Sequence, residues 1–433
     1  MRRRKRSASP PLVGSITVPG DKSISHRALI FAALGEGTSR LQGLNTGDDV
    51  ESTRRCLAHL GVPTRRNIED LSEVVVEGSG WDGLSEPNQV LDAGNSGTTI
   101  RCLAGLCAAI PGLSVLTGDE TLRRRPMLRI VEPLTAMGAS IAGRSGGDLA
   151  PLAIRGGALT GMKHDLRVAS AQVKTALVLA GLRASGHTEI REPGPSRDHT
   201  ERMLGALGAP VAAGHGTVSV SPVGSLPAAD RRVPGDVSSA LFLVAAALVV
   251  EGSDLEIKDV GLNPTRTGAL EILRGMGARL EWDATDESGG EPRGTIRARY
   301  SKLVGTTVDP ALVPRAIDEF PILAVVASQA DGATRITGAG ELRVKESDRI
   351  RTTATGLTAL GVRVETLDDG MVVHGPSDLV RGEVDAEGDH RIALAFAVAG
   401  LIAGGDVRVK GWSSVETSFP EFLDVLGKAR GRR

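Results

Sequence analysis

Aromatic side chains, cysteines and long apolar runs are all scarce in this sequence. One tyrosine, three tryptophans and six phenylalanines in 433 residues are too few for a surface that stacks nucleic-acid bases. The three cysteines (Cys56, Cys102 and Cys107) are odd in number and lack metal-ligand spacing, which favours reduced, structural thiols. The longest apolar run, 240–250, is shorter than the roughly 18 residues that a membrane-spanning helix needs. We therefore expect a cytoplasmic protein without a membrane partner.

Net charge is also nearly absent, because 51 basic side chains oppose 52 acidic ones. No global field would attract nucleic acid or anionic lipid. Nine of the basic residues are lysines, so each lysine is informative. The basic segment 1–11 is followed by no apolar stretch, so we interpret it as a tail, with an organelle address as the alternative and a secretory signal excluded.

A short motif typical of helix ends recurs along the chain. It reads Leu-x-x-Leu/Met-Gly before a small or branched residue, and its glycine suits the left-handed terminus of a helix. A strand-like alternation follows, as at 279–282 and 363–366. Five copies start at Leu57, Leu134, Leu204, Leu273 and Leu357, and a truncated sixth starts at Leu423.

A second element repeats in phase with the first: an apolar helix, a glycine turn and a short alternating strand. Apolar residues surround these helices, which predicts that they are buried on all sides. Six copies span 28–41, 99–115, 175–190, 238–257, 321–336 and 391–409. The two phased repeats predict an α/β (α+β) fold of two similar domains, each with three units around buried helices.

Two matching Val-Pro-Gly turns, at 18–20 and 233–235, indicate where the chain passes between the domains. A Pro/Ala/Ser-rich linker, 221–232, precedes the second turn. We expect one domain to span 21–234 and the other to join 1–20 to 235–433. A cleft between two such domains is where a ligand is expected.

Polar, glycine- or serine-rich segments precede four of the buried helices, at 20–27, 94–101, 170–174 and 388–391. Helix N-termini attract anions, although Ser and Asn are also ordinary N-caps. A cation lies within a turn of each: Lys22, Arg27, Arg101, Lys174 and Arg391. Four such segments in phase predict a site for ligands that carry phosphate and carboxylate groups.

Three further charged segments have both a plain and a functional interpretation. The run 122–126 is either a solvated loop or an anion site, and 343–349 is either a set of surface ion pairs or a site that uses Lys345. Asp318 is either a helix N-cap or a general base. P-loop, dinucleotide-binding, metal-ligand and Gly-x-Ser-x-Gly motifs are missing, so the chemistry falls to lysines, arginines and carboxylates acting on phosphorylated substrates.

Together these segments resemble the motifs of the 3-phosphoshikimate 1-carboxyvinyltransferase (EPSP synthase) family, an enolpyruvyl transferase family. The matching segments are 19–27, 94–98 with Arg101, 124–126, 343–350 and 389–391. The resemblance implies two domains, each of three βαβαββ units in an inside-out α/β barrel. It also implies transfer of the enolpyruvyl group of phosphoenolpyruvate to the 5-hydroxyl of shikimate 3-phosphate, with release of phosphate. We expect a monomer that needs no cofactor and no metal ion.

The resemblance also assigns roles to individual residues. The catalytic residues would be Lys22, Asp318 and Glu346. Shikimate 3-phosphate would be bound by Lys22, Ser23, Arg27, Ser170, Ala171, Gln172, Ser196, Asp318 and Lys345. Phosphoenolpyruvate would be bound by Lys22, Gly97, Arg125, Gln172, Arg349, Arg391 and Thr417.

Two positions depart from the family pattern. Ala171 replaces a serine that many members place near the phosphate, so Lys174 or the Ser196–Arg197 pair would have to compensate. Thr417 occupies a position that is lysine in some members. The glycine at position 97 predicts a glyphosate-sensitive enzyme.

The nearest alternative is the sister transferase that acts on UDP-N-acetylglucosamine. That family resembles this one in fold, but it has Lys-Asn in place of Lys22-Ser23 and usually a cysteine at the position of Glu120. A non-catalytic, anion-binding scaffold is a third interpretation, and it leaves the sparse lysines and the phased carboxylates unexplained.

Overall fold

A computed structural model describes residues 9–214 and 216–431, which form two compact units. The terminal unit contains 9–19, 235–286 and 292–431, and the central unit contains 20–234 and 287–291. Residues 1–8 of the expected basic tail lie outside the described residues. In the part of the chain that is described, no helix is both long and apolar enough to cross a bilayer.

The unit boundaries differ from the expected ones at two places. Gly20 groups with the central unit, and so does the hairpin tip Glu287–Glu291, although the strands on either side of the tip belong to the terminal unit. The tip is held by a buried contact between Glu291 Oε1 and His199 Nδ1, which are 2.8 Å apart. Ser288 Oγ also donates to the carbonyl of Arg232 over 2.7 Å. Such long-range contacts leave no local sequence signal.

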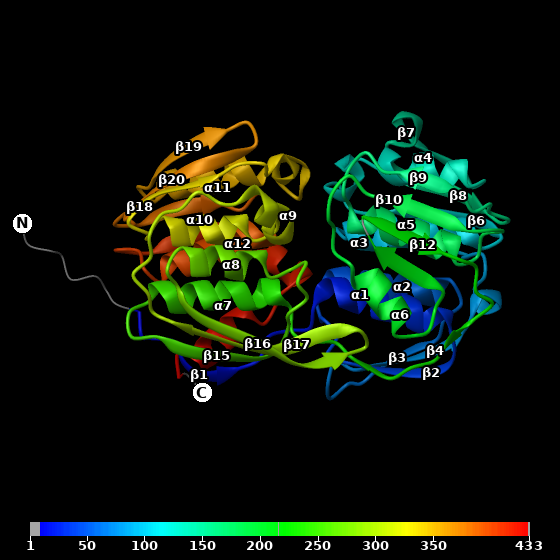
Figure 1. Cartoon of the computed structure of the whole chain (residues 1–433), viewed down its shortest axis with the longest axis horizontal. Helices are drawn as coiled ribbons and strands as arrows, with labels where there is room; N and C mark the ends of the chain where they lie inside the picture. The colour runs from blue at the N-terminus through cyan, green and yellow to red at the C-terminus, as the bar shows by residue number, and fades with distance from the viewer. Residues whose placement is uncertain (1–8, 215, 432–433) are drawn as a thin grey trace, which may run out of the picture. The chain divides into compact units, whose positions relative to one another are not determined.

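The central unit has three sheets, with helices packed against them (Figure 1). The first sheet orders its strands β13 (Leu226–Pro227), β2 (Gly35–Gln42), β4 (Val74–Ser79) and β3 (Thr64–Arg66), with β14 (Arg231–Arg232) also on β2. The second orders β5 (Leu91–Asp92), β6 (Gly112–Thr117), β8 (Leu149–Gly156) and β7 (Ser140–Arg144). The third orders β11 (Val211–Gly214), β12 (Thr217–Val220), β10 (Thr188–Arg191) and β9 (Lys163–Asp165).

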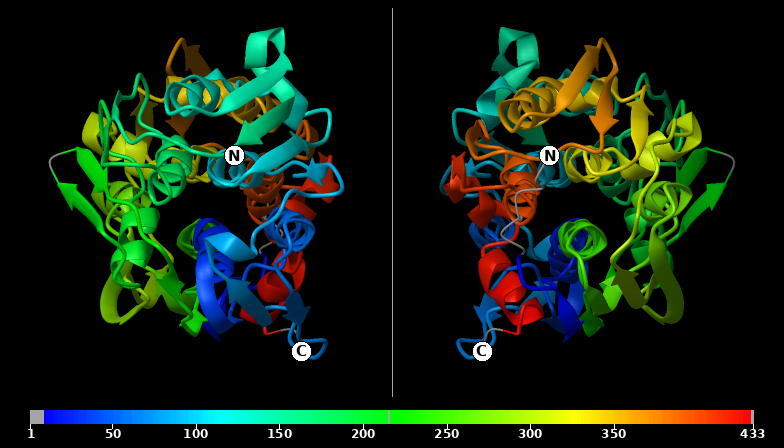
Figure 2. Two further views of the ribbon diagram at one scale, coloured as in Figure 1. Left: turned by 90° about the vertical axis from the view of Figure 1, so that its right-hand side faces the viewer. Right: turned by 90° about the vertical axis from the view of Figure 1, so that its left-hand side faces the viewer.

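The terminal unit repeats this plan with smaller sheets. The first orders β1 (Val13–Ile16), β15 (Asp254–Gly261), β17 (Glu291–Arg299) and β16 (Arg279–Ser288). The second orders β18 (Gly332–Ile336), β20 (Gly370–Gly375) and β19 (Arg363–Leu367), and the third pairs β21 (Gly382–Asp385) with β22 (Val407–Lys410). Figure 2 shows the strands of both units at the periphery, around the helices.

Six helices, one in each repeat, are buried almost throughout. They are α1 (Lys22–Leu34), α3 (Gly97–Ala109), α5 (Ala171–Gly181), α7 (Val237–Val249), α10 (Phe320–Ala327) and α12 (His390–Gly400). Each has the apolar sequence that predicted burial. The α/β fold class is therefore confirmed, and these helices form the core of their units.

The second helix of each repeat includes residues that are partly or fully exposed, and it ends near a glycine. These helices are α2 (Asp48–His59), α4 (Leu128–Ala136), α6 (His199–Gly205), α8 (Gly268–Gly275), α11 (Arg349–Ala359) and α13 (Phe422–Ala429). The glycines of the five complete motifs have positive φ, for example +95° at Gly61 and +86° at Gly361. The sixth prediction is wrong in detail: Gly427 lies inside α13, and the positive-φ glycine is Gly431.

The first repeat of each unit takes its first strand from a distant part of the chain. β1 pairs in parallel with β15, so that Val13 lies opposite Asp254. β13 and β14 pair in parallel with β2, so that Arg231 lies opposite Leu41. The two Val-Pro-Gly turns follow these strands directly.

Candidate functional site

Side chains cap most of the buried helices, and the chemistry of the caps differs. Ser96 and Ser170 cap α3 and α5 with neutral hydroxyls, whereas Asp21 and Asp389 cap α1 and α12 with carboxylates. A carboxylate already occupies the favourable anionic position at a helix N-terminus. The N-termini of α3 and α5 therefore suit an external anion, while α1 and α12 offer mainly their side-chain cations.

In the central unit, Lys22 is the first residue of α1 and forms an ion pair with Asp49 on α2. Its Nζ lies 2.9 Å from Asp49 Oδ2, and both side chains are nearly buried. Because a short acidic segment at a helix start is a common N-terminal feature, sequence reasoning missed Asp49 as a partner of Lys22.

Arg27, on the next turn of α1, is buried and connects three helices. Its Nε donates to Thr200 Oγ1 and its Nη2 to Thr175 Oγ1, both over 2.7 Å. Its Nη1 donates to the carbonyl of Ser23 over 2.9 Å. The guanidinium thus fixes the backbone of Ser23 against α5 and α6. Its direct contact with shikimate 3-phosphate stays a prediction.

Burial lowers the pKa of His26, on the same turn, well below its ordinary value of 6.5, and the nearby charges of Lys22 and Arg27 lower it further. The Nδ1 atom is hydrogen-bonded to Thr53 Oγ1 at 2.7 Å. The imidazole is therefore neutral at physiological pH and adds no third positive charge beside Lys22.

Two guanidinium groups flank the N-terminus of α3. Arg101 Nη1 donates to Gln172 Oε1 over 2.6 Å, and Arg125 Nη2 donates to Asn95 Oδ1 over 2.8 Å. A Cβ on Gly97 would lie 3.0 Å from Arg101 Nη1 and 3.1 Å from Arg125 Nη1. Glycine at position 97 therefore lets both cations approach the helix end closely.

The segment 122–126 agrees in part with each of its two interpretations, a solvated loop and an anion site. Arg124 is exposed and pairs with Glu120, as a solvated loop predicts, whereas Arg125 is buried beside Gly97.

Near the N-terminus of α5, Lys174 and Arg197 have different partners. Lys174 Nζ lies 2.7 Å from both Glu192 Oε2 and Glu201 Oε1, and only 3% of its side chain is exposed. Arg197 Nη1 instead donates to Ser23 Oγ over 3.4 Å. Two carboxylates already engage the Lys174 ammonium group, so these contacts favour Arg197 of the two compensations expected for Ala171.

In the terminal unit, Arg349 at the start of α11 gathers three carboxylates. Its guanidinium lies 2.7 Å from Asp389, 3.0 Å from Asp318 and 2.6 Å from Glu346. Burial opposes the charged form, yet these carboxylates raise the pKa of Arg349 above its ordinary value. Lys345 Nζ adds a second cation 3.4 Å from Asp318 Oδ1. Arg349 is thus the buried centre of the carboxylate cluster. The family resemblance assigns Arg349 to phosphoenolpyruvate binding, and that assignment stays a prediction.

Arg391, at the start of α12, faces Asp318 and Glu319. Its Nη1 donates to the carbonyl of Asp318 and to Glu319 Oε1, both over 3.3 Å. Thr417 lies on a 3-10 helix (Trp412–Thr417) and donates its hydroxyl to the carbonyl of Ser414 over 2.7 Å.

The expected residues therefore form two groups. The central cluster comprises Lys22, Ser23, Arg27, Gly97, Arg101, Arg125, Ser170, Ala171, Gln172, Ser196 and Arg197. The terminal cluster comprises Asp318, Glu319, Lys345, Glu346, Arg349, Asp389 and Arg391. The first combines cations with neutral polar groups, with Asp49 and Glu192 beside them, whereas carboxylates and cations are interleaved in the second. Such groups can bind phosphate and carboxylate groups and can move protons.

Comparison with known proteins identifies the family. The family model of EPSP synthase (3-phosphoshikimate 1-carboxyvinyltransferase) matches residues 7–426. The chain is 48% identical over 419 residues to the 3-phosphoshikimate 1-carboxyvinyltransferase of Shouchella clausii, covering 97% of both chains. It is 51% identical over 416 residues to that of Halorhodospira halophila, covering 96% of this chain and 93% of the relative.

Solved structures show the same relationship. EPSP synthase from Acinetobacter baumannii matches with a TM-score of 0.87 and 42% identity, covering 98% of this chain and 97% of that one. The enolpyruvyl transferase NikO from Streptomyces tendae shares the fold, with a TM-score of 0.76 at 18% identity and coverage of 98% and 96%. The chain therefore belongs to the EPSP synthase (3-phosphoshikimate 1-carboxyvinyltransferase) family.

Proposed function

We propose that this chain transfers the enolpyruvyl group of phosphoenolpyruvate to the 5-hydroxyl of shikimate 3-phosphate and releases phosphate, a step of aromatic amino-acid biosynthesis. The match of the family model to residues 7–426 carries the proposal. The two clusters supply groups that the reaction needs: cations for two phosphorylated substrates, and carboxylates that move protons.

Shikimate 3-phosphate is bound mainly by the central cluster in this proposal. Ser170 Oγ accepts the backbone N–H of Val173 as an N-cap, so its hydroxyl hydrogen can be donated to the phosphate. Arg197, beside Ser23, donates hydrogen bonds to the phosphate in place of the serine hydroxyl that Ala171 lacks. Gln172 and Lys22 complete this subsite, with Asp318 and Lys345 near the ring hydroxyls.

Phosphoenolpyruvate uses the cations that surround Gly97 together with those of the terminal cluster. Arg125 and Lys22 suit the phosphate, because both are cations beside the N-termini of buried helices. Arg391 suits the carboxylate, since an arginine can bind a carboxylate through two parallel hydrogen bonds. Arg349 contributes indirectly by holding Asp318 and Glu346 in place.

The chemistry proceeds by addition and elimination. Glu346 takes up a proton when the substrates bind and donates it to the methylene carbon of phosphoenolpyruvate, which makes C2 electrophilic. Asp318 accepts the proton of the attacking 5-hydroxyl. The new C–O bond gives a tetrahedral ketal. Glu346 then removes a proton from the methyl group, the C–O bond to phosphate breaks, and Lys22 protonates the leaving oxygen. Release of the proton from Asp318 and uptake of one by Lys22 restore the starting enzyme. The assignment of each proton to one of these three residues is part of the proposal.

The test is phosphate release in the presence of both substrates. Release that requires shikimate 3-phosphate and phosphoenolpyruvate together supports the proposal, and Lys22→Ala should abolish it without unfolding the protein. Release with UDP-N-acetylglucosamine in place of shikimate 3-phosphate would assign the sister activity. If phosphate is released with neither acceptor, the scaffold interpretation remains.

The proposal also includes a monomer that acts in the cytoplasm. Burial raises the pKa of the Cys56 and Cys107 thiols to about 12, so neither forms a reactive thiolate near neutral pH. Light scattering of the pure enzyme, with a mass near the 45.0 kDa of one chain, tests the oligomeric state.

A further inference from the structure

Glu319 is a buried carboxylate that the mechanism above does not use. It follows Asp318 directly and precedes α10, and its side chain is 2% exposed. Its Oε1 lies 2.5 Å from Ser238 Oγ and 3.3 Å from Arg391 Nη1. Glu319 therefore joins the proposed phosphoenolpyruvate arginine to the start of α7.

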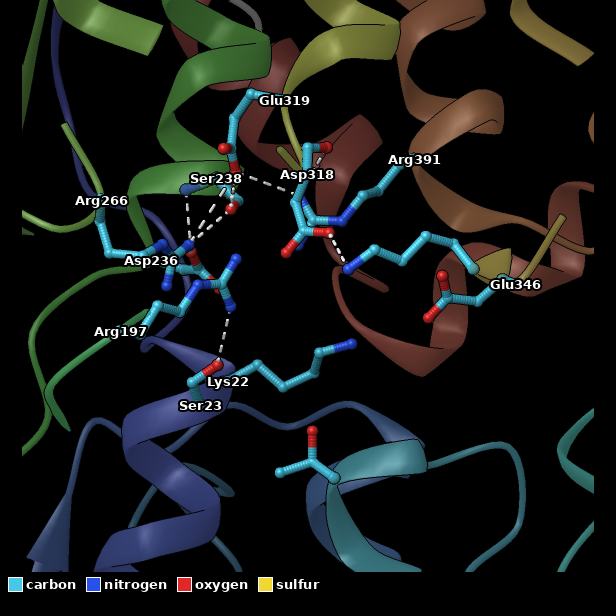
Figure 3. Close-up of polar contacts among 12 residues, drawn as sticks. Lys22, Ser23, Arg197, Asp236, Ser238, Arg266, Asp318, Glu319, Glu346 and Arg391 are labelled. Atoms are coloured by element: carbon cyan, nitrogen blue, oxygen red, sulfur yellow. Dashed lines mark hydrogen bonds and ion pairs between the residues drawn. The ribbon is translucent and has the colours of Figure 1, made fainter. Parts of the chain in front are cut away.

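Arg266 lies on the loop between β15 and α8 and contacts Ser238. Its Nη2 donates to Ser238 Oγ over 2.6 Å and lies 3.2 Å from Asp236 Oδ1, the N-cap of α7. The side chain is 3% exposed. Ser238, Arg266 and Glu319 point toward one another (Figure 3).

The hydrogen bonds in this group have a fixed direction. A guanidinium can only donate, so Ser238 Oγ accepts from Arg266. The single hydroxyl hydrogen of Ser238 is then donated to Glu319. Arg266 thus determines which way Ser238 points, and Ser238 determines where the Glu319 carboxylate presents its oxygen to Arg391.

Cations and carboxylates alternate in this group. Arg266 and Arg391 face Asp236 and Glu319, and all four side chains are buried. Arg391 also lies 4.0 Å from Asp318 Oδ2. Removing one buried partner leaves an uncompensated charge that must find another partner. Without Arg266, Glu319 would compete more strongly for the Arg391 guanidinium, which would then be less available to an incoming carboxylate.

We propose that Arg266 is a positioning residue for phosphoenolpyruvate binding, acting through Ser238 and Glu319 on Arg391. The inference rests on the proposed function, in which Arg391 binds the carboxylate of that substrate. A merely structural role, such as stabilising the start of α7, would lower thermal stability without a selective effect on one substrate.

The experiment compares Arg266→Met and Ser238→Ala with the control Arg315→Met. Arg315 is a suitable control because it binds the same loop, donating from Nε to the carbonyl of Pro264 over 2.7 Å and from Nη2 to Thr267 Oγ1 over 3.1 Å. Steady-state kinetics should show the KM for phosphoenolpyruvate raised about tenfold in Arg266→Met, with kcat and the KM for shikimate 3-phosphate within about twofold of wild type. Ser238→Ala should change the same parameter in the same direction, and Arg315→Met should change neither KM.

Arg266→Lys provides the conservative variant. Lysine restores the charge but lacks the planar fork, so its KM for phosphoenolpyruvate should fall between those of wild type and Arg266→Met. If Arg266→Met fails to fold, Ser238→Ala decides the question. Unchanged KM values in Ser238→Ala, or equal increases for both substrates, would overturn the inference. Wild-type protein that releases no phosphate from the two substrates would instead refute the proposed function.

Discussion

The hydroxyl of Ser196 donates to the Glu192 carboxylate over 2.9 Å. The same carboxylate accepts the backbone N–H of Ser170 over 3.1 Å and pairs with Lys174. A phosphate needs donors, and the single hydroxyl hydrogen of Ser196 already has an acceptor.

This contact predicts unequal roles for two neighbouring residues. Arg197→Ala should raise the KM for shikimate 3-phosphate about tenfold or more, because a charged hydrogen bond is lost. Ser196→Ala should raise it about threefold or less. Steady-state kinetics at saturating phosphoenolpyruvate measure both, and a larger effect from Ser196→Ala would assign the phosphate contact to the serine.

The close approach of Arg101 and Arg125 to Gly97 leads to a second prediction. Gly97→Ala places a methyl group 3.0 and 3.1 Å from their Nη1 atoms, so both cations must move. We expect the KM for phosphoenolpyruvate to rise about tenfold, in line with the cost of overpacking a tight site. Gly205→Ala is the matched control, since a Cβ there meets nothing within 4 Å. Equal kinetics in the two variants would show that the site tolerates the methyl group.

Glyphosate should inhibit this enzyme in competition with phosphoenolpyruvate. Its phosphonate and carboxylate are anions that the cations near Gly97 can bind in place of the substrate. Initial rates at several concentrations of both compounds should give lines that meet on the 1/v axis. Inhibition that rising phosphoenolpyruvate does not relieve would contradict the prediction.

The buried His26 makes stability depend on pH. Its pKa is lowered in the folded protein, so the unfolded chain binds the proton first as pH falls. The stabilisation is therefore complete above the ordinary value of 6.5 and declines below it, by up to about 1.4 kcal/mol per pH unit. Chemical denaturation of wild type and His26→Gln between pH 5 and 8 tests this, because the variant should show the shallower decline.

His187→Gln serves as the control for that comparison. His187 is exposed and its Nδ1 is 3.3 Å from Ser221 Oγ. Its replacement should leave the pH dependence as in wild type. A His26→Gln protein with the wild-type slope would mean that other groups cause the decline.

The buried helices could be predicted because their signal is local. A segment such as 393–402, with small and apolar residues on every side, can be stable only inside a core. The helix-ending glycines were found for the same reason, since a positive φ strongly favours that residue. Gly427 misled the prediction because the same pattern occurs inside α13, about one turn before the positive-φ glycine, Gly431.

The organisation of the charged groups could not be predicted to the same extent. The sequence indicates that Arg349 and Lys174 are important, but whether a cation meets a ligand or a carboxylate depends on residues far away in the chain. Arg349 pairs with Asp389, and Arg266 reaches Ser238, only after the helices have packed. The contact of Glu291, in the hairpin tip, with His199 likewise joins residues far apart in the sequence.

The pairing of β1 with β15 has a consequence for dividing the polypeptide. A piece that starts at residue 235 would lack β1 and would present the bare edge of β15 to solvent. Unprotected edges pair readily with other chains, so such a half would tend to self-associate. A piece that ends at residue 234 keeps β13 and β14 on β2 and so retains the strands of its first sheet. The two halves have the same plan, but they would therefore differ in their tendency to self-associate when each is produced alone.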